Sequence, residues 1–256
     1  MSDWNPTQYL AFADERARPA LDLIAHLHAR APRLIHDIGC GPGNSTALLR
    51  QAFPQTMLTG LDSSPAMIEK ARAVLPGVAF SVGDVADWLP HPEADLVFAN
   101  ALFQWLPDHV VIIRRILDAL RPGAVLALQV PDNLNEPSHL SMRKVAARPE
   151  FAGKLKGADG ARAQILSAQG YAQVLRNHAG AIDVWRTTYH HPLKGHQAIA
   201  ELFASTGLKP FIDPLGLADR KAFLAAYVKA IAPHYPLMDD GTLLFPFPRL
   251  FVVAVR

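Results

Sequence analysis

The sequence predicts an α/β fold in which a mostly parallel sheet is covered by helices on both faces. Short apolar runs alternate with amphipathic segments between residues 34 and 130, which is the pattern of consecutive βα units. A glycine-rich turn directly follows the first run, at the edge where open sheets of this kind bind ligands. The five runs are Leu34–Ile38, Met57–Asp62, Val78–Val82, Asp95–Ala99 and Ala124–Val130.

Helical spacing of apolar residues accounts for the segments between these runs. Arg18–Ala29 predicts a helix that leads into the first strand, and Val110–Leu120 is the clearest helix inside the repeat. That second helix is followed by Arg121-Pro122-Gly123, where proline and glycine end it before the fifth strand.

The pattern loosens after Pro131. Two further strands, at Ile182–His190 and Leu250–Val255, bring the predicted sheet to seven strands. The remaining segments read as helix and loop, and insertions of this kind usually lie over the carboxyl edge of a sheet. We therefore expect one domain over residues 1–256, with a ligand-binding core at 31–131 and helical cap insertions at 132–180 and 192–243.

Composition limits the possible partners. Half of the 256 residues are hydrophobic and 19% are charged, as in an ordinary globular enzyme. The net charge of +2 is too small to indicate nucleic acid or an anionic membrane. A single cysteine excludes an internal disulfide, and no run has the length of a membrane span. These features predict a soluble, cytoplasmic protein that acts as a monomer or weak homo-oligomer.

The glycine-rich turn carries the functional signal. Gly39, Gly41 and Gly43 follow the first strand, where glycine permits positive φ and lets a ligand approach the backbone. Asp37 stands just before the turn, and Asp62 ends the next strand 25 residues later. An acid at that strand end can accept both hydroxyls of a ribose.

Two cofactor classes compete for this turn. NAD enzymes use Gly-x-Gly-x-x-Gly, so that a helix N-terminus meets a pyrophosphate. Here the third glycine comes one residue earlier, and Asp37 would repel a phosphate but attract a cation. A sulfonium amino acid fits better than a dinucleotide. A purely structural turn would leave unexplained the acids at three successive strand ends, Asp37, Asp62 and Asp84.

The spacing Asp37-x-Gly39-x-Gly41-x-Gly43 resembles motif I of the class I S-adenosylmethionine (SAM) dependent methyltransferases. The resemblance implies a Rossmann-like methyltransferase fold and SAM as the cofactor. It implies that Asp37 helps to hold the methionine amino group and that Asp84 binds the adenine amino group. The cofactor-binding residues expected on this basis are Asp37, Gly39, Cys40, Gly41, Asn44, Ser45, Asp62, Ser63, Met67, Asp84, Val85, Asn100, Phe103 and Gln104.

Further motifs along almost the whole chain are similar to the trans-aconitate methyltransferase family. They include Trp4-Asn5-Pro6, Cys40-Gly41-Pro42-Gly43-Asn44-Ser45-Thr46, Gln104-Trp105-Leu106-Pro107-Asp108-His109, Trp185-Arg186-Thr187-Thr188-Tyr189 and Phe247-Pro248-Arg249-Leu250-Phe251. The resemblance implies methyl transfer from SAM to a carboxylate of trans-aconitate or a related small polycarboxylate, and a last strand antiparallel to the rest beside the fifth. Ala152–Ala168 departs from the family, which leaves substrate details open.

A carboxylate acceptor needs little from the protein's own acid–base groups. It is ionised at neutral pH and can attack a methyl group unaided, so we expect no catalytic residue. The histidines lack zinc-ligand spacing, so we expect no metal. Arginines and aromatic residues are the expected substrate contacts. The candidates are Trp4, Tyr9, Arg16, Arg18, Trp105, Arg143, Arg186 and His190.

Other activities stay open on the sequence alone. Transfer to nitrogen, carbon or a phenol oxygen would require a catalytic base, which the sequence does not identify. A non-catalytic SAM-binding module would keep the glycine turn and its acids without turnover.

Overall fold

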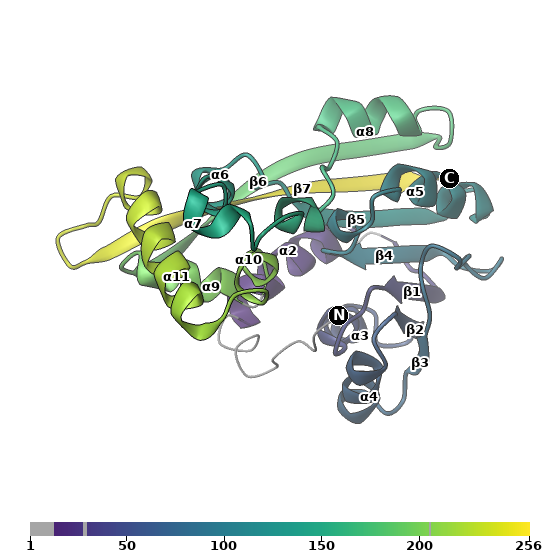
Figure 1. Ribbon diagram of the computed structural model, residues 1–256. Helices are drawn as coiled ribbons and strands as arrows, with labels where there is room; N and C mark the ends of the chain where they lie inside the picture. The colour runs from purple at the N-terminus through teal and green to yellow at the C-terminus, as the bar shows by residue number, and fades with distance from the viewer. Residues whose placement is uncertain (1–12, 28–29, 205) are drawn as a thin grey trace. The chain divides into compact units, whose positions relative to one another are not determined.

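The computed structural model describes residues 13–27, 30–204 and 206–256, with side chains from residue 17 onward in the first range. These residues form two compact units, which are described one at a time. The sheet unit comprises Arg16–Pro131, Gln164–Thr187 and Arg249–Arg256. The helical unit holds residues 13–15, Asp132–Ala163 and Thr188–Pro248. The strands β6 (Ala181–Lys194) and β7 (Thr242–Val255) contribute residues to both units (Figure 1).

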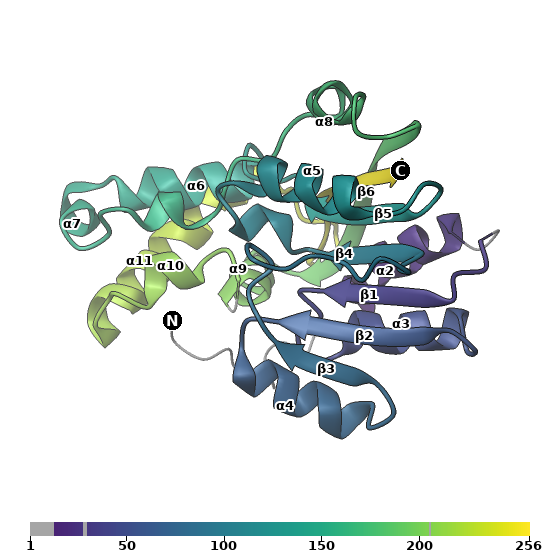
Figure 2. The same ribbon diagram turned by 90° about the vertical axis from the view of Figure 1, so that its right-hand side faces the viewer.

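The sheet has seven strands in the order β3-β2-β1-β4-β5-β7-β6. The strands β1 to β5 run parallel, and Figure 2 shows them side by side in that order. β7 is antiparallel to β5, with Val125 opposite Val255. The predicted seven-stranded, mostly parallel sheet with an antiparallel last strand is confirmed. The first five strands span Leu34–Ile38, Met57–Asp62, Ala79–Val82, Leu96–Asn100 and Val125–Pro131.

One face of the sheet is covered by α5 (His109–Ala119) and α8 (Ala168–Leu175). Ile112 and Ile116 of α5 share a buried apolar cluster with Leu126 and Leu128 of β5, which are two residues apart and so lie on the same face. Burying one such side chain is worth about 1.5–3 kcal/mol. This cluster is therefore a main source of stability for the sheet unit.

The opposite face carries aromatic and polar side chains. Trp185 of β6 stacks on Phe251 of β7, with ring centroids 4.8 Å apart, and His26 lies 4.5 Å from Trp185. His26 ends α2 (Ala13–His26), so this helix covers the face. The helices α3 (Asn44–Ala52) and α4 (Pro65–Val74) follow β1 and β2 in the chain and contact β2 and β3.

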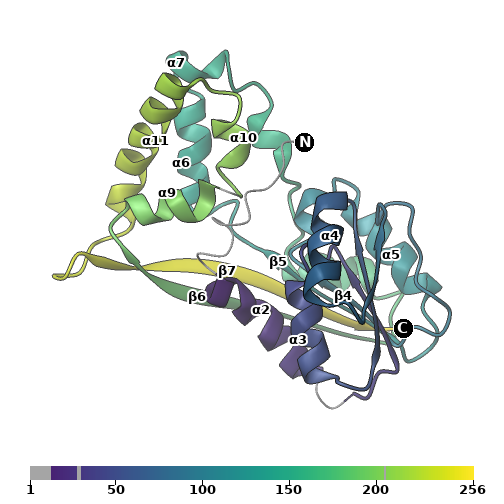
Figure 3. The same ribbon diagram turned by 90° about the horizontal axis from the view of Figure 1, so that it is seen from below.

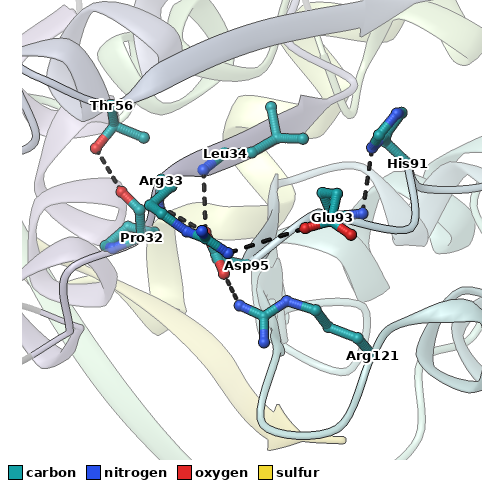
Figure 4. A network of polar contacts seen from close by, with 8 residues as sticks. All are labelled: Pro32, Arg33, Leu34, Thr56, His91, Glu93, Asp95 and Arg121. Atoms are coloured by element: carbon teal, nitrogen blue, oxygen red, sulfur yellow. Dashed lines mark hydrogen bonds and ion pairs between the residues drawn. The ribbon is translucent and has the colours of Figure 1, made fainter.

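A polar cluster closes the amino ends of β1 and β4 (Figure 4). Asp95 accepts the backbone N–H groups of Arg33 and Leu34 at 2.6 and 3.2 Å, and it also pairs with the Arg121 guanidinium. The cluster satisfies groups that the strand ends would otherwise leave unpaired. Because it lies at the opposite end of the strands from the glycine turn, its role is structural.

The helical unit is built around its own apolar core. Phe223 lies 5.3 Å from Phe151 and 6.1 Å from Phe211, measured between ring centroids. Figure 3 shows α6 and α11 side by side within this unit, in agreement with their contacts. The elements that belong to it are α6 (Pro137–Ala146), α7 (Pro149–Ala152), η2 (Ala158–Ala161), α9 (Gln197–Ala204), α10 (Lys209–Ile212), α11 (Leu217–Ile231) and η3 (Ala232–His234).

The first predicted cap insertion, residues 132–180, is divided between the two units. Residues 164–187, including α8, group with the sheet unit, whereas the sequence expectation placed residues 132–180 together in a cap. Among the helices of the described ranges, none has the length and apolar character needed to cross a membrane.

Candidate functional site

The glycine turn joins β1 to α3 with three residues in the left-handed region. The φ angles of Gly39, Gly41 and Gly43 are 66°, 55° and 91°. A Cβ at Gly39 would lie 2.7 Å from Leu102 Cδ1, so glycine is required there by both conformation and space. A Cβ at Gly41 would meet nothing within 4 Å. The backbone at Gly41 therefore borders open space in which a ligand can lie against it.

Asp37 is a buried acid beneath this turn, with 1% of its surface exposed. Its Oδ2 accepts hydrogen bonds from the hydroxyls of Ser45 at 2.7 Å and Thr46 at 2.6 Å. These bonds tie the end of β1 to the start of α3. Among the described residues, Oδ1 has no hydrogen-bond partner. A buried acceptor left in this state favours a ligand that supplies a donor.

Burial also shapes the charge of this acid. It raises the pKa of Asp37 to about 7, and the nearby Asp62 carboxylate adds to the shift, while the Thr46 and Ser45 hydroxyls oppose it. A cationic ligand would favour the ionised form and lower the pKa again. The Asp37 carboxyl is thus suited to an ammonium group and unsuited to a phosphate.

Asp62 ties the turn to the second strand. Its Oδ2 accepts the N–H of Gly41 and its Oδ1 accepts the N–H of Ser64, both at 2.9 Å. Ser64 is also the N-cap of α4, whose Met67 N–H donates to the serine hydroxyl at 3.4 Å. Each carboxylate oxygen has a second acceptor position, so Asp62 can still bind ligand hydroxyls.

The third acid lies beyond β3. Asp84 is exposed, and its Oδ1 accepts the N–H of Ala86 at 2.8 Å, while Val85 beside it is buried. Because β1, β2 and β3 are neighbours in the sheet and parallel, the three acids lie along one edge. Ser63 is exposed and Met67 partly buried next to this edge.

The end of β4 holds the strained residue of the site. Ala101 has a φ of 56° although it is not glycine, a conformation that is uncommon and recurs at functional positions. Gln104 donates to the Ala101 carbonyl at 2.5 Å, and Asn100 accepts a hydrogen bond from Gln129 of β5. Gln104 and Phe103 are both buried, with 2% and 0% exposed. They support the Ala101 turn from within the core.

Cys40 packs inside the turn. It is 3% exposed, and burial raises the pKa of its thiol well above the usual range. Its sulfur would lie 3.0 Å from a Cβ at Gly60. The thiol is therefore a small packed group and not a nucleophile.

A buried polar chain leads from the site across the sheet. Arg249 of β7 donates to Gln129 Oε1 at 3.5 Å, and Gln129 donates to Asn100. The strand register places these three side chains on one face, the face that also carries Phe251. The sequence alone did not identify Gln129, Arg249, Thr46 or Leu102 as residues of the site. A glutamine within an otherwise apolar, fully buried strand was the available signal for Gln129.

The predicted substrate residues are spread over both units. In the sheet unit, Arg18 and Arg186 are exposed and Trp105 is partly buried. Arg186 shares a face of β6 with Ile182 and Val184, opposite Trp185. Trp4, Tyr9 and the side chain of Arg16 lie outside the described residues.

The other two candidates lie in the helical unit. Arg143 of α6 donates to the Leu134 carbonyl at 2.7 Å, and His190 is exposed between the buried residues Tyr189 and His191. Over the part of the chain that the structure describes, no cluster of three or more His, Cys, Asp or Glu side chains could hold a metal ion.

A parallel sheet in this order, with an antiparallel seventh strand and a ligand turn after β1, defines a class I, Rossmann-like methyltransferase. Residues 35–123 match the family model described as "Methyltransferase domain". The structure is similar to the YcgJ protein from Bacillus subtilis, with a TM-score of 0.62 at 16% identity over 93% of this chain and 98% of that one. It also resembles Haemonchus contortus phosphoethanolamine N-methyltransferase 2, with a TM-score of 0.55 at 15% identity over 93% and 52% of the two chains.

Curated relatives give the particular family. The chain is 51% identical to the trans-aconitate 2-methyltransferase of Methylobacterium nodulans over 100% of this chain and 99% of that protein. It is 48% identical to the protein of the same name from Rhodopseudomonas palustris over the full length of both. The chain belongs to the trans-aconitate 2-methyltransferase family. The open backbone at Gly41 and the unpaired Oδ1 of Asp37 fit SAM, the cofactor of this class.

Proposed function

We propose that the protein transfers a methyl group from SAM to a carboxylate of trans-aconitate or a closely related small polycarboxylate. The products are a monomethyl ester and S-adenosylhomocysteine. The observation that carries this proposal is the identity of 45–51% over the whole chain to relatives named for that reaction.

Three acids are assigned to the cofactor. The Asp62 carboxylate binds the ribose hydroxyls with the acceptor positions that Gly41 and Ser64 leave open. Asp37 holds the methionine amino group through Oδ1, directly or through water. Asp84 and the backbone of Val85 receive the adenine. The glycine turn lets the methionine part lie against the backbone.

When bound, SAM supplies an electrophilic methyl group, which moves to a carboxylate oxygen as the carbon–sulfur bond breaks. The acceptor carboxylate is ionised at neutral pH, so no side chain has to remove a proton. One buried histidine of the sheet unit, His36, is occupied within the fold. Burial, with His91 nearby, lowers the pKa of His36 to about 4, and its ring nitrogens are used by Thr59 at 2.6 Å and the His91 N–H at 3.2 Å.

The protein contributes position and surroundings. Aligning oxygen, methyl carbon and sulfur can contribute roughly 7–11 kcal/mol to lowering the barrier. The reaction neutralises an anion and a cation, so a site with little water stabilises it relative to bulk solvent. Arginine side chains are the expected partners for the carboxylates that do not react, because a guanidinium pairs with a carboxylate through two parallel hydrogen bonds.

The organisation of the chain and its setting are part of the same proposal. We expect one catalytic domain, whose core at residues 31–131 binds SAM and whose helical insertions recognise the acid. The enzyme is expected to act in the cytoplasm as a monomer or weak homo-oligomer, without nucleic acid. Size-exclusion chromatography with light scattering, with and without added DNA, tests the last two statements.

Incubation with methyl-labelled SAM and a panel of small acids tests the reaction. The label should enter a tricarboxylate as a base-labile ester, which mass spectrometry identifies as a monomethyl product. Asp62→Ala serves as the control with impaired cofactor binding. A base-stable label would indicate transfer to nitrogen or carbon, and SAM binding without turnover of any acid would indicate a non-catalytic module; either result contradicts the proposal.

A further inference from the structure

The end of β4 carries a carboxamide whose orientation is decided elsewhere in the sheet. Asn100 is the last residue of β4, two residues past Phe98, which is paired with Asp37 of β1. Leu102, two residues further on, packs against the glycine turn, because a Cβ at Gly39 would lie 2.7 Å from its Cδ1. Asn100 therefore stands at the carboxyl edge of the sheet, where sheets of this kind bind their ligands.

Gln129 of β5 holds this end of β4 with both its backbone and its side chain. It lies opposite Asn100 in the parallel register, and its carbonyl accepts the Ala101 N–H at 2.9 Å. Its side-chain amide donates to Asn100 Oδ1. Ala101 has a positive φ, so the carbonyl bond supports the turn at its strained residue. Because Gln129 is 1% exposed, the packing around it leaves the amide little freedom to turn.

Arg249 of β7 sets the direction of the Gln129 amide. Its Nη1 donates to Gln129 Oε1 at 3.5 Å, and both side chains are buried. A guanidinium has donors and no acceptor, so the Gln129 oxygen has to face Arg249 and the NH2 group has to face away. A reversed amide would bring N–H groups of the two side chains together inside the fold, where the unmet bonds would be costly.

The same constraint passes on to Asn100. Because the Gln129 NH2 group donates, the atom that meets it is Asn100 Oδ1, and the NH2 group of Asn100 is turned away from Gln129. Asn100 is partly exposed, and its Nδ2 makes no hydrogen bond with any residue that the structure describes. Two N–H donors are thus available to a ligand at this edge of the sheet.

The direction of these hydrogen bonds discriminates between ligand groups. An N–H donor is a partner for a carboxylate oxygen, whereas an amine that keeps its lone pair for the methyl group offers only hydrogens. We propose that Gln129 is a positioning residue that, together with Arg249, holds the Asn100 carboxamide with its donors toward a carboxylate. The carboxylate is either that of the methyl acceptor, a reading that rests on the proposed function, or that of the methionine part of SAM.

Gln129→Glu tests this polarity with almost no change of shape. The new carboxyl group is ionised beside the Arg249 guanidinium and has acceptors only, so Asn100 must turn its NH2 group toward it and offer Oδ1 to the ligand. The KM for trans-aconitate or the Kd for S-adenosylhomocysteine should rise roughly tenfold to hundredfold. Gln51→Glu is the matched control, because Gln51 is exposed near the end of α3 that is remote from the glycine turn, and the substitution adds the same charge.

A double substitution separates positioning from general packing. Asn100→Ala removes the donors and should raise the same constant about tenfold. If Gln129 acts through Asn100, adding Gln129→Glu to Asn100→Ala should change that constant by less than about twofold, whereas independent effects would multiply. Asn100→Asp tests the polarity without altering the core, since it can still accept from Gln129 but turns an anionic oxygen toward the ligand. It should weaken binding at least as much as Gln129→Glu does, and urea unfolding confirms that each variant is folded.

The two constants identify the carboxylate. A higher KM for trans-aconitate with an unchanged Kd for S-adenosylhomocysteine assigns it to the methyl acceptor, and the reverse result assigns it to the methionine part of SAM. Values in Gln129→Glu and Asn100→Asp that match those of Gln51→Glu would overturn the inference, as would multiplying effects in the double variant. Calorimetric titration of trans-aconitate into the S-adenosylhomocysteine complex gives the same comparison without turnover. A wild type whose binding of trans-aconitate depends on Asn100 but which methylates no acid would overturn the proposed function alone.

Discussion

Asp62→Ala tests how the second acid serves the site. One of its oxygens accepts from Gly41 and the other from Ser64, both at 2.9 Å, and the remaining acceptor positions are assigned to the ribose. Leaving the ligand hydroxyls without acceptors costs about 1–3 kcal/mol. Because about 1.4 kcal/mol corresponds to a tenfold change in Kd, the Kd for SAM should rise roughly 5- to 150-fold.

The same substitution should lower the free energy of unfolding by about 1–3 kcal/mol, because two backbone N–H groups lose their acceptor. Calorimetric titration with S-adenosylhomocysteine measures the Kd, and urea unfolding measures the stability. Glu69→Ala is the matched control, since Glu69 is exposed on the neighbouring α4 and its loss removes the same charge. A folded Asp62→Ala variant that binds as tightly as Glu69→Ala would refute the assignment of the ribose.

Further predictions concern the turn itself. Burial raises the pKa of Asp37 to about 7, and a cationic ligand favours its ionised form, so the affinity for SAM should increase with pH up to about 7 and then level off. Asp37→Asn should remove this pH dependence of SAM affinity in titrations from pH 5.5 to 8. If the affinity of Asp37→Asn still increases with pH, another group causes the dependence. Gly39→Ala should lose about 2–4 kcal/mol of stability in urea unfolding, because it adds a contact with Leu102 to the cost of positive φ. Gly41→Ala should lose only about 1–2 kcal/mol of stability, but it should weaken S-adenosylhomocysteine binding more than Gly39→Ala does. Weaker binding by Gly39→Ala than by Gly41→Ala would contradict an open ligand face at Gly41. The thiol of Cys40 should react with iodoacetamide far more slowly in the native protein than in urea, and equal rates would show that it is not packed.

Strand positions in the sheet unit were predictable because their apolar runs are short and bounded by turn residues. Leu34–Ile38 and Met57–Asp62 were predicted with the bounds that the structure shows, and the predicted helix Val110–Leu120 differs from α5 by one residue at each end. The last strand was predicted from Leu250, whereas β7 begins at Thr242.

The physical reason for the shorter prediction is proline. Pro246 and Pro248 stand just before Leu250 and interrupt the apolar run. In the structure, the pairing of β7 with β5 ends at Arg249, so neither proline removes a hydrogen bond from that ladder. Beyond the end of β5, this stretch of β7 has only β6 as a neighbour in the sheet, and proline is tolerated on a strand with one open side.

The residues of the functional site were likewise predictable only where the local sequence determines their role. Asp37 and Asp62 could be identified because their role depends on spacing around one turn and one strand end. Gln129 and Arg249 could not, because 120 residues separate them and only the pairing of β5 with β7 brings them together. Arg143 was selected as a substrate contact from the sequence, and the structure places it in the lining of a cavity between α6, η2 and α10.

The most direct test of the cofactor assignment is a calorimetric comparison of S-adenosylhomocysteine and NAD as ligands of the purified protein. We predict that S-adenosylhomocysteine binds at one site per chain and that NAD neither binds there nor displaces it. Tighter binding of NAD than of S-adenosylhomocysteine would mean that the turn after β1 receives a pyrophosphate, and the proposed chemistry would be wrong.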